Sequence, residues 1–385
     1  MTPPLRYAMI GGGQGSFIGA VHRMAIALDG TGTLVAGALN SDPARARQSG
    51  AALGLPASRS YDSHRELLVG EASLPRDQRA QFIVIVTPNA SHADLAIACL
   101  RAGFPVVLDK PLTRTLAEAR SLQAVVRDAG LPFAITYNYT GYPLIRHAAE
   151  LVRQGALGTV RKVVVEYHQG WLTTALEVSG QKQASWRTDP AQAGAGALGD
   201  IGTHAENLLS TVAGLEIESV SADIACVVPG RRVDDDAVVT ARCVGGARAL
   251  LSISQVATGE ENNLSLRVYG DTAGLSWRQE DPNQLWLLPR DGPRRLITRG
   301  GLTGSAAAAT RLPPGHPEGF IEGFANVYRS FAGALRADLA RQTLPNDWWP
   351  APGIAEGVRG VRFVHACLES ARSGGTSVRL DALSE

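Results

Sequence analysis

Cysteine is scarce in this chain of 385 residues, and the four that occur stand far apart. Cys99, Cys226, Cys243 and Cys367 form no CxxC pair, and His365 near Cys367 is too little for a metal signature. Neither a disulfide framework nor a metal site is expected. This cysteine usage fits a reducing compartment, so we expect a cytoplasmic protein.

An excess of charge and a long apolar run are also missing. Lys and Arg number 37 against 36 Asp and Glu, which leaves a formal net charge of +1. Such a chain has no long-range field for phosphate backbones or anionic lipid, so we expect no nucleic-acid or membrane partner. No apolar run approaches the roughly 20 residues of a membrane span, and MTPPLRYAM lacks the apolar core of a signal peptide.

Glycine is plentiful, and it gathers early in the stretch IGGGQGSFIGAVH, residues 10–22. An apolar run at 7–10 precedes the glycines, and apolar residues recur at helical spacing over 18–28. The order strand, glycine-rich turn, helix is the first half of a βαβ unit. A chain of this length usually forms two domains.

The alternation of strands and helices continues to about residue 140. We expect strands at 34–39, 82–86, 106–108 and 133–137, and helices at 42–53, 93–102 and 116–129. This order predicts an α/β domain, residues 1–140, with a doubly wound parallel sheet of the Rossmann type.

Residues 141–385 have a different pattern, which indicates a second, α+β domain. Strands are expected at 160–168, 219–228, 237–243, 249–255, 264–269 and 285–288, with few helices between them, so its sheet should be mostly antiparallel. Residues 300–319 are rich in Gly, Ala and Pro and are predicted to form a long loop.

The glycine-rich turn is the first candidate for a cofactor site. Glycines at this point let the backbone approach a pyrophosphate, whose charge is met by the helix N-terminus, and a side chain at Gly13 should block that approach. In GxGxxG, the third glycine would fall at Ser16, so Gly19 takes that place only if the turn is enlarged. The predicted contacts are Gly11, Gly13, Gly15, Ser16, Phe17 and Ile18.

The residue that reads the ribose lies at the end of the second strand, where Asn40 and Ser41 stand. An acid there selects NAD, and small or basic residues admit the phosphate of NADP. An amide is compatible with both cofactors, so the residues leave NAD and NADP open.

Two further stretches follow strands at the carboxyl edge of the predicted sheet, where open α/β folds bind ligands. They are TPNASH, residues 87–92, and DKP, residues 109–111. Taken alone, Lys110 would be a solvated loop lysine and His92 a helix-start residue. Beside the glycine-rich turn, a lysine can bond a substrate hydroxyl and assist proton transfer.

The strongest catalytic candidates of the second domain lie in GAGALGDIGTHAENL, residues 194–208. If a helix begins near Asp200, then Asp200, His204 and Asn207 lie on one face. Alcohol oxidation needs a base for the hydroxyl proton, and histidine titrates in the useful range. A core histidine bonded to a helix-capping aspartate is the alternative.

These motifs, in this order and over most of the chain, resemble the glucose-fructose oxidoreductase and inositol dehydrogenase (Gfo/Idh/MocA) family. The resemblance implies a Rossmann domain, an open-faced sheet domain, NAD or NADP as cofactor, and a sugar, cyclitol or other polyol as substrate. The catalytic lysine, aspartate and histidine of that family match Lys110, Asp200 and His204 in this sequence. The resemblance also places further residues along the cofactor, namely Thr87, Pro88, Asn89, His92, Asp109 and Asn138.

Other side chains are candidates for the substrate pocket, because indole rings stack on sugars while amide, Arg and His groups bond hydroxyls. They are Trp171, Trp186, Arg187, Asn207 and His316.

Two other functions remain open, a ligand-sensing protein on the same fold and a reductase of an aldehyde, imine or enal. The presence of Lys110, Asp200 and His204 together favours an enzyme. An exposed apolar sheet face favours a homo-dimer or homo-tetramer.

Overall fold

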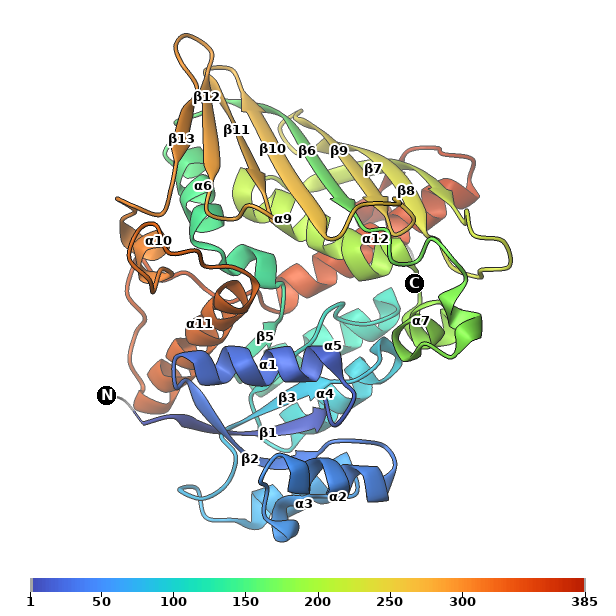
Figure 1. The fold of residues 1–385 in the computed structure, drawn as a ribbon, viewed down its shortest axis with the longest axis vertical. Coiled ribbons are helices and arrows are strands. Elements are labelled where there is room, and N and C mark those ends of the chain that lie inside the picture. Colours follow the sequence, from blue (N-terminus) through green and yellow to red (C-terminus); the bar gives the residue numbers. More distant parts are fainter. Residues whose placement is uncertain (1–2, 384–385) are drawn as a thin grey trace. The chain divides into compact units, whose positions relative to one another are not determined.

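A computed structural model describes residues 3–383 of the chain (Figure 1). These residues divide into two compact units. The first holds residues up to 113 together with 118–136 and 324–357, and the second holds 114–117, 137–323 and the residues from 358 onward. The expected single boundary at residue 140 did not anticipate that residues 324–357 group with the first unit.

The first unit contains a parallel sheet with the strand order β2-β1-β3-β4-β5. Its strands are β1 (Leu5–Gly11), β2 (Gly32–Ala38), β3 (Phe82–Val86), β4 (Val106–Leu108) and β5 (Phe133–Ile135). The helices between them are α1 (Phe17–Leu28), α2 (Pro43–Ala52), α3 (His64–Ser73), α4 (His92–Arg101) and α5 (Leu116–Ala129). The predicted Rossmann-type doubly wound sheet is confirmed.

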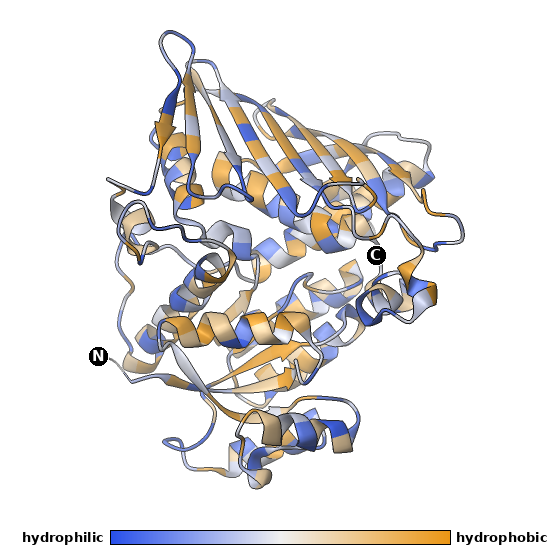
Figure 2. Cartoon of the chain, viewed as in Figure 1, coloured by the Kyte–Doolittle hydropathy of each residue, from blue (hydrophilic) through white to orange (hydrophobic). Residues whose placement is uncertain are grey.

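Strand β3 shows why this sheet forms the core of its unit. All five residues of its sequence FIVIV are buried, and the strand is apolar along its whole length (Figure 2). A strand without alternation must be covered on both faces, as parallel strands are. β1 lies between β2 and β3, so the chain reverses its direction of winding there, and the turns after β1 and β3 flank the switch point.

The second unit contains a nine-stranded sheet with the order β13-β12-β11-β10-β6-β9-β8-β7-β14. Neighbouring strands are antiparallel except β6 and β9, which run parallel. The strands are β6 (Val160–His168), β7 (Ile217–Ala225), β8 (Asp236–Cys243), β9 (Arg248–Ser254), β10 (Asn263–Gly270), β11 (Ala273–Arg278), β12 (Leu285–Pro289), β13 (Arg295–Ile297) and β14 (Val378–Arg379). The mostly antiparallel second sheet is thus confirmed.

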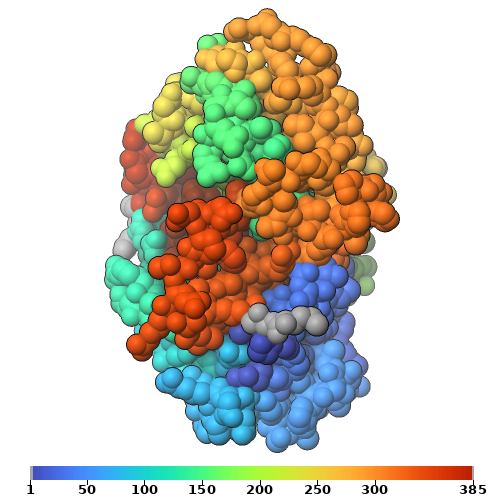
Figure 3. All heavy atoms as spheres, turned by 90° about the vertical axis from the view of Figure 1, so that its left-hand side faces the viewer, coloured from blue at the N-terminus to red at the C-terminus, as the bar shows by residue number. Residues whose placement is uncertain are grey.

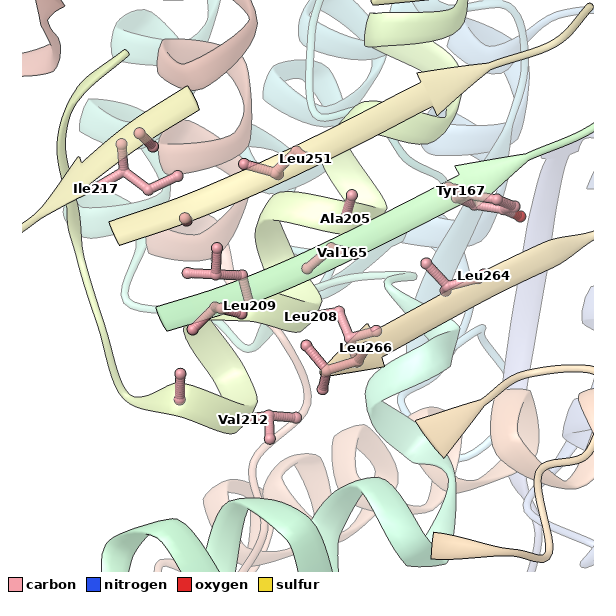
Figure 4. Close-up of a cluster of buried hydrophobic side chains, with 14 of the residues drawn as sticks. Val165, Tyr167, Ala205, Leu208, Leu209, Val212, Ile217, Leu251, Leu264 and Leu266 are labelled. Carbon is pink, nitrogen blue, oxygen red and sulfur yellow. The ribbon is translucent and has the colours of Figure 1, made fainter. Parts of the chain in front are cut away.

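Helices α6 (Pro143–Arg153), α9 (Thr203–Ala213) and α12 (Ile354–Arg372) lie along one face of this sheet (Figure 1). α9 packs Leu208, Leu209 and Val212 against β6, β9 and β10 (Figure 4). The strands alternate, as in β8, where Ala237, Val239, Ala241 and Cys243 are buried and the residues between them face outward. Within residues 3–383, no helix of this unit covers the outer face.

The remaining helices frame the second unit's loops. They are α7 (Lys182–Arg187), α8 (Pro190–Ala193) and α10 (Gly304–Ala308). Helix α11 (Phe320–Ala340) belongs mostly to the first unit. α10 interrupts the long loop expected at 300–319 and packs against α6 (Figure 3). In the part of the chain described, no helix combines the length and apolarity needed to cross a membrane.

Candidate active site

The glycine-rich turn joins β1 to α1, and its glycines serve different purposes. Gly11 and Gly15 adopt positive φ angles of 76° and 75°. A Cβ on Gly15 would meet nothing within 4 Å, so this part of the turn is open. A Cβ on Gly19 would lie 2.5 Å from the Cα of Gly12, so Gly19 is the glycine of close helix packing. Ser16 caps α1, its Oγ accepting from the amide of Gly19 at 3.2 Å.

These features fit a dinucleotide phosphate group. The turn combines open backbone with a capped helix N-terminus, and anions bind at such termini because their N–H groups and dipole favour negative charge. Phe17 is 70% exposed at the first position of α1, and Ile18 beside it is half-buried. The enlarged turn is therefore a Rossmann turn whose third glycine is displaced along the chain.

Asn40 follows β2, and its side chain organises the next turn. Its Oδ1 accepts from the amide of Asp42 at 3.0 Å, and Asp42 in turn caps α2 by accepting from the amide of Arg45 at 2.9 Å. Ser41 between them is exposed. Arg47 forms an ion pair with Asp62 at 3.1 Å, so this nearby guanidinium already has a partner within the protein.

The stretches after β3 and β4 are joined by His92. Its ring nitrogens lie 2.9 Å from the carbonyl of Thr87 and 2.8 Å from the carbonyl of Pro111, and the residue is 1% exposed. Burial lowers the pKa of His92. Ser91 donates its hydroxyl to Oγ1 of Thr87 at 2.8 Å. Of the other two residues of this stretch with predicted cofactor roles, Pro88 is exposed and Asn89 is buried.

Lys110 follows a buried acid, Asp109. The carboxylate of Asp109 accepts from the hydroxyl of Thr136 at 2.8 Å and from the amide of Lys110 at 2.9 Å. Burial alone would raise the pKa of Asp109, but His22, whose Nε2 lies 3.8 Å away, together with Lys110 and Thr136, holds it well below its usual range. Asp109 is therefore a carboxylate that anchors the backbone beneath Lys110, which is itself half-buried.

In the second unit, Asp200 and His204 occupy the start of a helix, as predicted, although its first turn is of the π type. This turn, η5 (Leu198–Gly202), leads directly into α9. π turns inside helices recur at functional sites. His204 is 5% exposed, and Asp200 is half-buried.

Three tyrosine rings surround the His204 imidazole. The centroids of Tyr139, Tyr137 and Tyr167 lie 4.8, 5.6 and 6.3 Å from that of His204. Burial raises the pKa of both Tyr139 and Tyr167, so these phenols are neutral. The sequence analysis did not select these tyrosines, although YNYTGYP lies directly after the last parallel strand.

The Asp200 carboxylate has partners from two directions. Nε2 of Gln255 donates to its Oδ2 at 2.9 Å, and Nε of Arg187 lies 3.4 Å from the same oxygen. The Arg187 guanidinium lies over the Trp186 ring at 4.3 Å. The structure thus brings two of the predicted substrate residues to Asp200, and it adds Gln255, which sequence reasoning missed.

Two buried amides lie on elements that contact each other, η3 (Asn138–Gly141) and α9. Asn138 is 4% exposed and Asn207 is 1% exposed. Among residues 3–383, neither Nδ2 has a hydrogen-bond partner, and a buried amide of this kind points to a group from outside the chain.

Two further candidates are placed differently. Trp171 is half-buried and donates its indole N–H to Oε1 of Gln169 at 3.1 Å. His316 is exposed, and its carbonyl accepts from the guanidinium of Arg299, within a cluster that also includes Glu318.

A parallel sheet with a glycine-rich turn at its switch point is typical of dinucleotide-binding proteins with a Rossmann fold. Residues 5–137 match the model of the oxidoreductase family with an NAD-binding Rossmann fold, and residues 145–276 match the GFO/IDH/MocA C-terminal domain. The chain belongs to the GFO/IDH/MocA family and is an oxidoreductase that uses a nicotinamide cofactor.

Individual relatives agree over nearly the whole chain. It is 30% identical over 380 residues to the uncharacterized oxidoreductase YfiI of Bacillus subtilis, covering 97% of this chain and 96% of that one. An inositol dehydrogenase homolog of Azotobacter vinelandii in complex with NAD+ superposes with a TM-score of 0.93 and 35% identity over 98% of both chains. The structure of such a homolog with NADH and myo-inositol gives a TM-score of 0.89 and 34% identity, again over 98% of both chains.

Proposed function

We propose that the protein transfers hydride between a nicotinamide and a ring carbon bearing the hydroxyl of a cyclitol, sugar or glycoside. The observation that carries this proposal is the buried imidazole of His204, enclosed by tyrosines and close along the helix to Asp200. A neighbour of similar fold holds NADH together with myo-inositol. Hydroxyl-rich ligands suit a site that combines carboxylate, guanidinium and amide groups.

Each of three side chains has one role in this proposal. When the alcohol is oxidised, His204 accepts the hydroxyl proton while hydride leaves the same carbon, and in the reverse direction it returns the proton. Lys110 polarises and orients the reacting oxygen, and Asp200 fixes the imidazole. The nicotinamide supplies the hydride acceptor. The proton and the electron pair are thereby both accounted for.

The amides of Asn138 and Asn207 complete the proposal. Both are buried with donors that have no partner among the described residues, so each is available to a ligand carbonyl or hydroxyl. We assign Asn138 to the nicotinamide end of the cofactor and Asn207 to a substrate hydroxyl.

The test is a panel of polyols and glycosides in which the absorbance of the reduced nicotinamide is followed in both directions. With the best substrate, Lys110→Ala and His204→Ala should each lower kcat about 10²- to 10⁴-fold while cofactor affinity stays intact. The double variant should be little worse than either single variant, because residues that act as a unit are non-additive.

Lys182→Ala and His64→Ala are matched controls, because one lies at the exposed start of α7 and the other at the start of α3. Both should retain near-normal kcat. Near-normal turnover of Lys110→Ala or His204→Ala would exclude the assigned roles.

We further propose that the outer face of the nine-stranded sheet joins two copies of the chain. Its apolar side chains include Val238, Trp286 and Leu296, which are 43%, 40% and 44% exposed. They lie on β8, β12 and β13, and exposed apolar side chains on a sheet face that no described helix covers support a contact with a second copy.

A further inference from the structure

Asp200 is held by a chain of side chains rather than by a single partner. Gln255 is 2% exposed, and its Nε2 donates to Oδ2 of Asp200 at 2.9 Å and to Oε1 of Gln169 at 3.2 Å. Oε1 of Gln169 also accepts the indole N–H of Trp171 at 3.1 Å. Four side chains from three segments thus form one hydrogen-bonded path that ends on the carboxylate.

The direction of the hydrogen bonds along this path is constrained at both of its ends. An indole N–H can only donate, so Gln169 must turn its oxygen toward Trp171. The same oxygen can accept a second hydrogen bond, and Nε2 of Gln255 donates it. The second hydrogen of the same nitrogen is directed at Asp200. The Asp200 carboxylate can only accept, so the donor at Trp171 and the acceptor at Asp200 favour the same arrangement of the two amides.

The amide nitrogen of the Gln169 side chain also has a fixed partner. Its Nε2 donates to Oδ1 of Asn262 at 2.7 Å. Asn262 forms a closed ring with two phenols, since Tyr167 donates to its Oδ1 at 2.8 Å and its Nδ2 donates to the Tyr139 oxygen at 3.2 Å. The two phenol oxygens are 2.6 Å apart, so Tyr139 donates to Tyr167. The rings of these tyrosines are the ones that surround the His204 imidazole.

The fold explains why the two glutamines meet. β6 and β9 are the parallel pair of the second sheet, and His168 is in register with Ser254. Gln169 and Gln255 are the residues that directly follow this pair, so both emerge at the same edge of the sheet. The amide of Gln169 donates to the carbonyl of Ser254 at 2.8 Å, which fixes the two backbones there.

We propose that Gln255, Gln169 and Trp171 are positioning residues, which orient the Asp200 carboxylate through a hydrogen-bond path that begins at the Trp171 indole N–H. This inference rests on the proposed function of Asp200. Trp171 accordingly acts through its N–H on a protein side chain, in addition to any contact of its ring with a substrate. The path also joins the carboxylate to the tyrosines around His204, so acid and imidazole share one frame.

The first test replaces the polar amide of Gln255 by an apolar side chain of similar size. Gln255→Met should lower kcat about ten- to a hundredfold, the range that corresponds to a hydrogen bond with a charged group, while cofactor affinity is unchanged. Trp171→Phe should lower kcat in the same direction by a smaller factor, because the Gln169 oxygen loses one of its two donors while Asn262 and Gln255 still hold its amide. Gln81→Met is the matched control, because Gln81 is half-buried and its Oε1 accepts from the amide of Arg6 at 3.0 Å, beside the amino ends of β1 and β3. It should keep near-normal kcat.

A second variant separates positioning from a general loss of packing. In Gln255→Glu, the new side chain can donate to Asp200 only when it is protonated, because two carboxylates at this distance share a proton. Its kcat relative to the wild type should therefore rise as pH falls. Four titratable or charged groups face the pair, Arg187 from α7, Tyr139 from η3, Tyr167 from β6 and His204 from α9, and division by the wild-type value removes their shared contribution.

Crystal structures of the wild type, Gln255→Met and Trp171→Phe test the inference without any substrate. The carboxylate of Asp200 should rotate away from its wild-type position in Gln255→Met, and the Gln169 side chain should shift from its wild-type position in Trp171→Phe. An unmoved carboxylate in Gln255→Met, or a pH-independent activity ratio in Gln255→Glu, would overturn the positioning roles. A wild type inactive on the whole panel would instead overturn the proposed function, and the crystal structures would still decide the positioning.

Discussion

At the scale of single residues, several motif side chains have structural duties that their sequence positions do not reveal. His92 and Asp109 both lie in stretches that follow strands at the ligand edge of the sheet. His92 contacts two carbonyls and so ties the segment after β3 to the segment after β4. Asp109 supports the backbone of Lys110. Side chains that hold a site together and side chains that touch a ligand therefore stand next to each other in the same motif.

Asn40 gives a prediction at this scale. Asn40→Asp should weaken NADP binding at least tenfold and leave NAD binding nearly unchanged, because a carboxylate at the end of β2 repels the 2′-phosphate and accepts from a ribose hydroxyl. The local turn should survive, since a carboxylate oxygen can still accept from the amide of Asp42. Titration of both cofactors by fluorescence measures the two affinities.

Asn40→Ala is the control for this change. It removes the acceptor for the Asp42 amide without adding charge, so its effects on NAD and NADP should be similar. If Asn40→Asp binds NADP as tightly as the wild type does, Asn40 does not face the ribose.

At the scale of elements, several strands and a helix were predicted with their exact bounds and others were missed. The strands at 82–86, 106–108 and 160–168 and the helix at 116–129 have the predicted bounds, because their apolar runs or periodic faces end abruptly. β11 was missed, since its AGLSWR has little alternation, and α6 was missed in a domain expected to hold few helices. The Asp200–His204 helix was predicted, but its π turn depends on hydrogen-bond geometry that spacing does not encode.

The candidate site was predictable from the sequence only for residues that lie close together in one short segment. Asp200 and His204 share a short segment, so spacing alone brings them together. Gln255 lies 55 residues from Asp200, and their contact depends on the packing of η5 against the end of β9. Long-range packing of this kind leaves no periodic signal in the sequence.

The glycine-rich turn carries the prediction at this scale. A Cβ on Gly13 would lie 2.6 Å from the carbonyl of Leu39 and 2.7 Å from the hydroxyl of Ser49, so a side chain there would first displace the protein's own chain. The expectation that it would act on the pyrophosphate alone is therefore wrong. Gly19 is the better site, because Gly19→Ala brings a methyl group to 2.5 Å from the backbone of Gly12 and forces α1 away from the turn.

Gly19→Ala should lower the free energy of unfolding by about 1–3 kcal/mol and weaken NAD binding more than tenfold. Thermal unfolding and cofactor titration measure the two effects. Gly30→Ala is the control: Gly30 has a φ of 60° and open space around its Cβ, so it should lose about 1–2 kcal/mol of stability through backbone strain and keep its NAD affinity. Intact affinity in Gly19→Ala would show that this packing does not shape the cofactor site.

At the scale of the whole molecule, chain order and spatial grouping differ. Residues 324–357 follow the second domain's strands in the sequence yet belong to the first unit. Two contacts explain this, since Tyr328 lies 2.5 Å from Nδ1 of His22 and the Phe331 ring packs against Phe82. Their partners lie hundreds of residues away, so a boundary drawn from local composition placed this segment in the second domain.

The outer face of the nine-stranded sheet gives the prediction for the assembly. Lys162, Arg248 and Arg242 are direct cross-strand neighbours and all exposed, and like charges in that position repel. Toward the opposite strand ends, the same face carries Asp223 and Asp236. A two-fold axis that reverses the strand direction would place the basic end of one copy on the acidic end of the other, with the apolar side chains between them.

Reversal of the basic row in Lys162→Glu with Arg248→Glu should therefore weaken self-association at least tenfold, measured by sedimentation over a concentration series. Adding Asp223→Lys and Asp236→Lys should restore it, because the two ends are again complementary. Arg101→Glu with Arg127→Glu makes the same change in net charge on exposed helix positions of the first unit and should leave association unchanged. A wild type that sediments as a monomer at micromolar concentration, or a fourfold variant that stays dissociated, would contradict pairing through this face.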